Sequence, residues 1–290
     1  MANASIIKLT FANSELSCNA ANGADLTYLV LGGKTLIKPR GFDKAENPWL
    51  FPFPNRLSDG KYSFEGRDYQ FPHNDYGRPN ALHGFVLEQA FSLKERGENE
   101  AQAWATLSYR YDGSLVYYPF PFDIAIKYIL TADELKVDIK VVNTGNTSLP
   151  AGLGWHPYFD LPSGKDTASM RLPGCQEIEI NELMIPTGKK HPSNCFDAYN
   201  GLKGVGLDTC FEVNEKNQTN AVGLSAGDDY EISIWQDAAH EFIQVYTPDD
   251  GKSIAIEPMT CGIDAFNTRE GLKVLNPHEN WEVSCGVKLV

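Results

Sequence analysis

The chain has 290 residues, of which 42% are hydrophobic and 22% charged, so it can bury a sizeable core and is globular rather than disordered. Its 25 lysines and arginines are outnumbered by 38 acidic residues, and the formal net charge of −13 disfavours nucleic acid as a partner, because a phosphate backbone would be repelled. The first residues lack the basic and apolar regions of a signal peptide, and no apolar run approaches the ~20 residues that span a bilayer. We expect a cytoplasmic protein that does not enter a membrane and is a monomer or a homodimer.

Alternation of apolar and polar residues with a period of two dominates the chain, which is typical of antiparallel strands with one wet face. In chain order it predicts strands over 5–11, 26–31, 103–111, 122–130, 134–142, 176–180, 230–235, 242–246, 253–257 and 281–289. The short Thr131-Ala132-Asp133 link predicts a hairpin between two of them. No segment holds a helical stripe, and 25 glycines and 17 prolines punctuate the chain at short intervals.

These features predict an all-β protein, a large antiparallel β-sandwich in which residues 1–290 form a single domain. No linker and no internal repeat divides the chain. Two stretches, 47–85 and 149–164, are loop-like in composition, and long loops on a rigid sandwich are where function usually lies.

The first loop-like stretch contains two polar motifs, FPFPNR and NALHGF. Arg56 follows two prolines that stiffen the chain, and an arginine on a stiff segment offers a fixed fork of donors for sugar hydroxyls or a carboxylate. His83 precedes Gly84, which permits a tight backbone. The alternative is that Arg56 closes a surface ion pair and that His83 is a satisfied buried histidine.

The second loop-like stretch contains GLGWHPYF, which places His156 among aromatic side chains and before a proline. Pro157 biases His156 toward an extended conformation. The flanking rings of Trp155 and Tyr158 would keep water away from the imidazole. The alternative is an aromatic strand that packs into the core.

Glu257 stands at the end of an apolar segment, 253–257, where Pro258 is expected to end the strand. A buried carboxylate is unfavourable unless it is paired or functional, and burial would raise its pKa and make it a better base. The alternative is a structural ion pair. Asp208, in GLDTCF, is a weak signal alone, because an aspartate before a strand is normally a turn former.

Metal and cofactor sites are not indicated by the sequence. None of the six cysteines forms a CxxC pair or lies at zinc-ligand spacing from a histidine, so we expect reduced, mostly buried thiols. No glycine-rich phosphate-binding loop is present. Four histidines in polar or proline-adjacent contexts are expected at the surface, namely His73, His191, His240 and His278. We therefore expect no metal and no cofactor.

Three motifs, in this order, resemble the aldose 1-epimerase family: FPFPNR followed by NALHGF, then GLGWHPYF, then IEPMTCGIDAFN. The resemblance extends over essentially the whole chain. It implies the large β-sandwich of galactose mutarotase-like proteins, and an enzyme that interconverts the α and β anomers of a hexose. It also implies that Glu257 is the catalytic base and His156 the catalytic acid. The substrate-binding residues that it implies are Asn55, Arg56, His83, Trp155 and Asp208.

In the implied reaction the C1 hydroxyl loses a proton and the ring oxygen gains one, the ring opens, and it recloses on the other face. Glu257 as a carboxylate and His156 as an imidazolium supply both transfers. This requires the carboxyl pKa to lie below the imidazole pKa, as the reference values of about 4.3 and 6.5 already do. An aromatic platform is expected for the apolar face of the sugar, with Trp155, Tyr158 and Trp235 as candidates.

Two other functions stay open, and a third is disfavoured. A hexose-6-phosphate 1-epimerase would need a basic cluster beside the pocket, which Lys61, Arg67 and Arg78 could supply. A non-catalytic carbohydrate-binding protein would not need an acid–base pair. A glycosidase is disfavoured, because its paired carboxylates lie ~5–9.5 Å apart around a glycosidic bond and here the glutamate is matched with a histidine.

Overall fold

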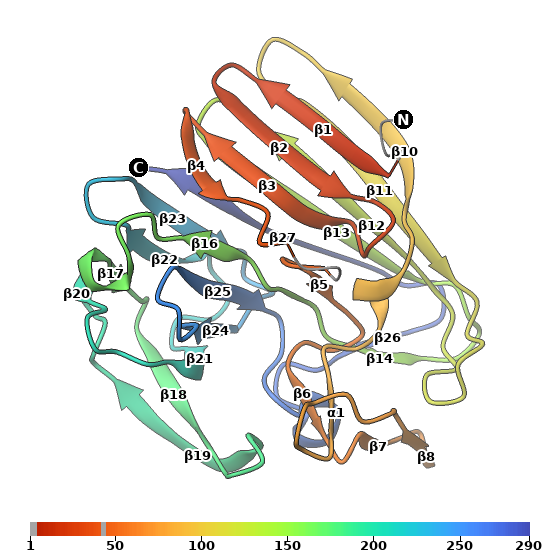
Figure 1. Cartoon of the computed structure of the whole chain (residues 1–290). Helices are drawn as coiled ribbons and strands as arrows, with labels where there is room; N and C mark the ends of the chain where they lie inside the picture. The colour runs from red at the N-terminus through yellow and green to blue at the C-terminus, as the bar shows by residue number, and fades with distance from the viewer. Residues whose placement is uncertain (1–4, 42–44) are drawn as a thin grey trace.

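Figure 1 shows the fold as a computed structural model, which describes residues 5–41 and 45–290. Regular structure in these residues is almost entirely β, and the predicted all-β class is confirmed. The helical elements in the described ranges are the short helix α1 (Ala265–Thr268) and the 3-10 turns η1 (Val86–Glu88) and η2 (Lys165–Thr167).

The largest sheet has nine strands that pair antiparallel. Its order is β10 (Ser92–Glu98), β11 (Ala103–Tyr111), β12 (Phe122–Leu130), β13 (Glu134–Asn143), β27 (Asn280–Leu289), β23 (Glu231–Gln236), β22 (Asn220–Ser225), β17 (Ser169–Arg171) and β20 (Asn200–Gly201). The predicted hairpin is β12–β13, in which Leu130 faces Leu135 across the turn.

The second sheet has eight strands and supplies most of the functional side chains described below. Its order is β19 (Pro186–Ser193), β18 (Cys175–Ile180), β21 (Asp208–Val213), β24 (Phe242–Tyr246), β25 (Ser253–Met259), β15 (Gly154–Trp155) and β5 (Trp49–Leu50), and β16 (Tyr158–Asp160) also pairs with β25.

The remaining strands form a four-stranded sheet and three two-stranded pairs. They are β1 (Ile6–Phe11), β2 (Ser14–Asn19), β3 (Asp25–Leu31) and β4 (Lys34–Ile37), then β6 (Arg56–Ser58) with β9 (Asn80–Leu82), β7 (Lys61–Phe64) with β8 (Arg67–Gln70), and β14 (Leu149–Ala151) with β26 (Lys273–Leu275). In Figure 1 the β1–β4 sheet lies over β11–β13, and β6–β8 gather with α1 at the opposite end of the molecule.

The alternation that predicts the strands also builds the core. In β12, Phe122, Ile124, Ile126 and Tyr128 are each 0% exposed, while the residues between them are partly exposed. The same arrangement holds in the neighbouring strands, so their apolar faces form one hydrophobic cluster that extends along the chain from Leu9 to Val287.

Three expectations about local structure are wrong. The strand β25 continues beyond Pro258 to Met259. The Ile256 N–H points to the Pro157 carbonyl, and an N–H group at position 258 would point to the same side of the strand. Proline is tolerated there because hydrogen bonding on that side is interrupted between β15 and β16. The stretches 47–85 and 149–164 contain eight short strands rather than continuous loop. His240 is buried rather than at the surface, and its ring is satisfied there because its Nδ1 lies 2.8 Å from the Asp237 carboxylate.

Within the described ranges, no helix is long and apolar enough to cross a membrane. All six cysteines are unpaired there, and all but Cys195 are buried, as predicted.

Candidate active site

Six of the seven side chains that we expected in the site line a single pocket of about 280 Å³. They reach it from β6, the turn after β9, the link between β15 and β16, and β21 and β25. The lining residues are Asn55, Arg56, Leu82, His83, His156, Tyr158, Asp208, Gln244, Tyr246 and Glu257. The volume is at the small end of the range for ligand pockets, so it suits a small molecule.

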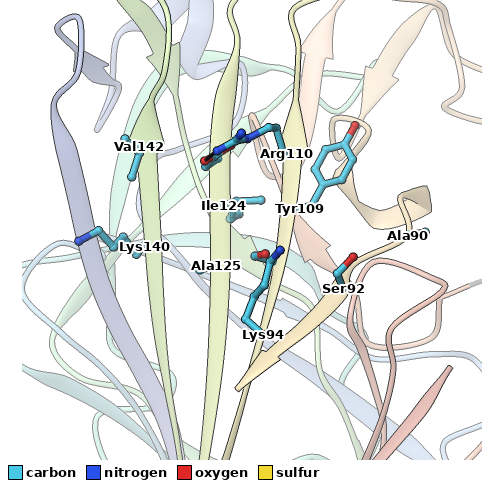
Figure 2. A pocket seen from close by; sticks show the side chains of 11 residues that line it. Ala90, Ser92, Lys94, Tyr109, Arg110, Ile124, Ala125, Lys140 and Val142 are labelled. Atoms are coloured by element: carbon cyan, nitrogen blue, oxygen red, sulfur yellow. Dashed lines mark hydrogen bonds and ion pairs between the residues drawn. The ribbon is translucent and has the colours of Figure 1, made fainter. Parts of the chain in front are cut away.

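A larger hollow of about 600 Å³ lies over β10–β13, and Figure 2 shows the side chains around it. Two of its three basic side chains are already paired: Arg110 donates two hydrogen bonds of 2.8 and 2.6 Å to Asp123, and Lys140 lies 2.8 Å from Glu282. Solvated ion pairs of this kind offer little chemistry, whereas buried titratable groups mark a reactive site. We therefore place the candidate active site in the smaller pocket.

Glu257 and His156 form the chemical centre of this pocket. The Glu257 Oε1 atom lies 3.2 Å from the His156 Nε2 atom, and the two side chains are 2% and 13% exposed. The second carboxyl oxygen, Oε2, is buried and has no hydrogen-bond partner among the residues that the structure describes. A buried carboxyl oxygen is normally satisfied, so Oε2 is free to accept a hydrogen bond from a ligand hydroxyl.

Burial shifts the two groups in opposite directions. It raises the pKa of Glu257 well above its usual value, and Asp208 adds to this shift while Arg56 opposes it. It lowers the pKa of His156 to about 4, and the positive charge of Arg40 contributes. The expected order, carboxyl below imidazole, is therefore wrong for the unliganded site, because loss of hydration disfavours the charged form of both groups.

His83 and Asn55 hold each other through reciprocal hydrogen bonds. The His83 N–H donates to the Asn55 carbonyl at 2.8 Å, and the Asn55 N–H donates to His83 Nδ1 at 3.1 Å. Since Nδ1 accepts, the proton of the neutral imidazole is assigned to Nε2. Burial also lowers the pKa of His83 well below its usual value. His83 is thus a neutral hydrogen-bond donor in the pocket wall.

Both residues of this pair have left-handed backbone angles, with φ of 57° at Asn55 and 66° at His83. Such angles are sparsely populated by side-chain-bearing residues and concentrate at functional sites. Gly84 follows with φ of 68°, and a Cβ atom there would lie 2.2 Å from the Phe51 carbonyl oxygen. The expectation of a tight backbone at Gly84 is confirmed.

Arg56 combines both roles that the sequence left open. Its Nε donates a 2.9 Å hydrogen bond to the buried carboxylate of Asp75, so it does close an ion pair. Its guanidinium nevertheless lines the pocket, where NH2 lies 4.0 Å from the Asp208 carboxylate. The ion pair therefore fixes the fork of donors that faces the pocket.

Gln244 is a lining residue that the sequence analysis missed. Its Nε2 donates to Asp208 at 2.6 Å, and its Oε1 accepts from the Asn55 Nδ2 at 3.1 Å. It stands directly opposite Glu257 in the β24–β25 ladder. Gln244 thus links the aspartate and the asparagine across the pocket.

The aromatic lining consists of Tyr158 and Tyr246, whose ring centroids are 6.3 Å apart at 84°. Trp155, predicted to bind substrate, is 0% exposed and stacks on Trp49 in the core, with centroids 5.4 Å apart. Adjacent residues of an extended chain point to opposite faces of the sheet, so the Trp155 side chain points into the core while the His156 side chain points into the pocket. Trp235 lies outside this lining, where its Nε1 donates to Glu134.

The basic cluster considered for a phosphate group is not in the pocket. Lys61 and Arg67 lie on the β7–β8 hairpin, and Lys61 pairs there with Asp59. Arg78 lies 3.8 Å from Asp75 on the far side of that carboxylate. None of the three lines the pocket.

Comparison with known families identifies the chain. The model of the family described as aldose 1-epimerase matches residues 8–288. The chain belongs to the aldose 1-epimerase family. It is therefore an isomerase that acts on carbohydrates, with a small-molecule sugar as its ligand.

Similar proteins support the same fold. YihR of Escherichia coli strain K12 is 27% identical over 277 residues, which are 88% of this chain and 85% of YihR. A galactose mutarotase-like protein from Clostridium acetobutylicum superposes with a TM-score of 0.88 at 20% identity, covering 98% of this chain and 95% of its own. Galactose 1-epimerase from Lactobacillus acidophilus superposes with a TM-score of 0.82 at 15% identity, covering 98% and 94%.

Proposed function

We propose that this epimerase is a mutarotase that interconverts the α and β anomers of a hexose through acid–base chemistry at Glu257 and His156. The observation that supports this most directly is the 3.2 Å contact between the Glu257 Oε1 and His156 Nε2 atoms in a small pocket. Ring opening needs one group to accept a proton and another to donate one, and both must lie within reach of a single sugar.

In the proposed reaction, the Glu257 carboxylate takes the proton of the C1 hydroxyl while the His156 imidazolium protonates the ring oxygen. The C1–O5 bond then breaks and leaves an aldehyde at C1. Rotation about the C1–C2 bond presents the other face of the aldehyde to the O5 hydroxyl. Reclosure returns one proton from Glu257 to the aldehyde oxygen and one from O5 to His156, so the pair ends as it began.

The shifted pKa values are compatible with this cycle because the pair needs only one proton in total. With the carboxyl pKa raised and the imidazole pKa lowered, the resting pair is a neutral carboxylic acid and a neutral imidazole. The reactive pair, a carboxylate and an imidazolium, contains the same number of protons. Transfer of one proton across the 3.2 Å contact therefore interconverts the two forms without exchange with solvent.

The other lining residues would align the sugar. Arg56 and the Nε2–H of His83 offer donors, the Asp208 carboxylate offers acceptors, and Asn55 braces this set through Gln244. Fixing the reactant in this way supplies part of the rate acceleration.

A polarimetric assay of freshly dissolved α-D-glucose and α-D-galactose tests the proposal. We expect the protein to speed the approach to anomeric equilibrium for at least one of the two sugars. Binding of both sugars with no change in the anomerisation rate would contradict it and would instead favour a non-catalytic carbohydrate-binding protein.

A further inference from the structure

We propose that Arg40 is a positioning residue for His156 and acts through the ring of Tyr158. This inference rests on the proposed function, in which His156 is the general acid. Arg40 follows β4 and was not among the expected site residues.

Three side chains form a continuous stack that ends at the reactive imidazole. The Arg40 Cζ atom lies 4.3 Å above the centroid of the Tyr158 ring. The Tyr158 ring in turn stacks on the His156 ring, with centroids 4.8 Å apart and an interplanar angle of 22°. The edge contact from His83, at 5.4 Å and 77°, restrains the imidazole from another direction. These contacts fix the plane in which Nε2 points at Glu257.

The chain segment after β4 also fixes the backbone beneath this stack. The Tyr158 N–H donates to the Asn47 side-chain oxygen at 2.8 Å, and the His156 N–H donates to the Pro48 carbonyl at 3.0 Å. Asn47 is itself held by the Asp25 carboxylate, which accepts its N–H at 2.6 Å. The same part of the chain thus holds both the backbone and the ring of Tyr158.

Arg40 adds a charge effect to this mechanical one. Its positive charge disfavours the imidazolium of His156, in the same direction as burial, and so keeps a second proton off the pair. The other ionisable groups that face His156 from the surrounding elements are Glu257 on β25, His83 after β9, Tyr158 on β16, Arg56 on β6, Asp208 on β21 and Tyr246 on β24.

Two substitutions separate the charge from the stacking. Arg40→Met keeps a long side chain and removes the charge, while Arg40→Lys keeps the charge and removes the planar guanidinium. We expect Arg40→Met to move the acid limb of the kcat profile, and the NMR titration of the His156 imidazole, to higher pH. We expect Arg40→Lys to leave both near the wild-type position while kcat falls by about two- to five-fold at constant KM, because an ammonium keeps the charge but cannot stack a planar group on the Tyr158 ring.

A third substitution tests the route through the ring. In a Tyr158→Leu background, where the stack is absent, Arg40→Lys should cause no further loss of kcat, whereas in Tyr158→Phe the loss should persist. Thermal unfolding of each variant verifies that it is folded, and Arg40→Gln replaces Arg40→Met if the latter is not. A His156 titration that is unchanged in both uncharged variants would overturn the proposal.

The NMR titration separates this proposal from the proposed function. It is measured on the free protein and requires no turnover. Absence of mutarotation by the wild type would refute the proposed function alone, while the titration would still show whether Arg40 controls the His156 imidazole.

Discussion

Raising the pH from 6.5 to 7.5 distinguishes a buried acid–base pair from an ordinary one. A pair with the reference values of about 4.3 and 6.5 would be active in its one-proton form between these values. At pH 7.5, one unit above the upper value, it would retain only about a tenth of its maximal kcat/KM. In this structure burial lowers the pKa of His156 to about 4 and raises that of Glu257 well above its usual value, so the one-proton form extends in both directions.

We therefore expect a bell-shaped profile of kcat/KM, with an acid limb near pH 4 that is set by His156 and a basic limb that is set by the raised pKa of Glu257. The loss between pH 6.5 and 7.5 should be smaller than for the reference pair. The assay is the initial rate of mutarotation in a series of buffers, extrapolated to zero buffer concentration because buffers also catalyse ring opening. His156→Asn, which lacks the second proton carrier, provides the background profile. A fall of about fivefold between pH 6.5 and 7.5, which is what the reference values give, would refute the reasoning from burial.

Three further predictions concern the surroundings of the pair. Gln244→Leu removes one hydrogen bond from Asn55 and one from the Asp208 carboxylate, and kcat/KM should fall by roughly ten- to a hundred-fold, the scale of one hydrogen bond to a charged group. An unchanged kcat/KM would show that these two bonds do not support the site. Trp155→Phe should lower the unfolding free energy by about 1–3 kcal/mol with KM within about twofold of wild type, since the ring is buried outside the pocket; a large rise in KM would contradict this. Burial raises the pKa of Asp25 to about 6, so the protonated Asp25 stabilises the fold fully below about pH 4 and this stabilisation is lost as the pH rises through about 6. In urea unfolding, the free energy of unfolding of the wild type should fall by up to about 3 kcal/mol more than that of Asp25→Asn across this pH window. Parallel pH curves for the two proteins would exclude this effect.

The strands of the sandwich were predictable because their alternation is strong and their two faces differ. The hairpin β12–β13 and the strand β11 follow the pattern closely. The short strands in 47–85 and 149–164 were not predictable, because two to four residues are too few to show a period. The strand β25 can continue through Pro258 because of the side of the strand to which an N–H group at this position would point. That side is known only once the sheet is assembled.

The site was predictable where a residue stands in a motif and not where its role depends on a neighbour in space. His156 and Glu257 were found in this way, and they do lie together. Gln244 lies in an apolar strand, and a glutamine between Ile243 and Val245 was a usable signal that we did not weigh. Trp155 and Tyr158 read alike in sequence, and only the break between β15 and β16 decides which of the two rings reaches the pocket.

The reversal of the expected pKa order has a different origin. Reference values describe hydrated groups, and a sequence does not report how much water a side chain keeps. Glu257 and His156 lose most of theirs, and their shifts follow from that loss.

The central claim is that Glu257 transfers a proton during anomerisation, and the most direct test compares wild type with Glu257→Gln in the polarimetric assay. The substitution keeps the shape of the side chain and removes its ability to exchange a proton, so kcat should fall by ~10²–10⁴-fold. Thermal unfolding should show a Tm close to that of the wild type, because the amide matches the shape and the neutral charge of the protonated carboxyl in the resting pair. A folded Glu257→Gln protein that retains wild-type kcat would contradict the account.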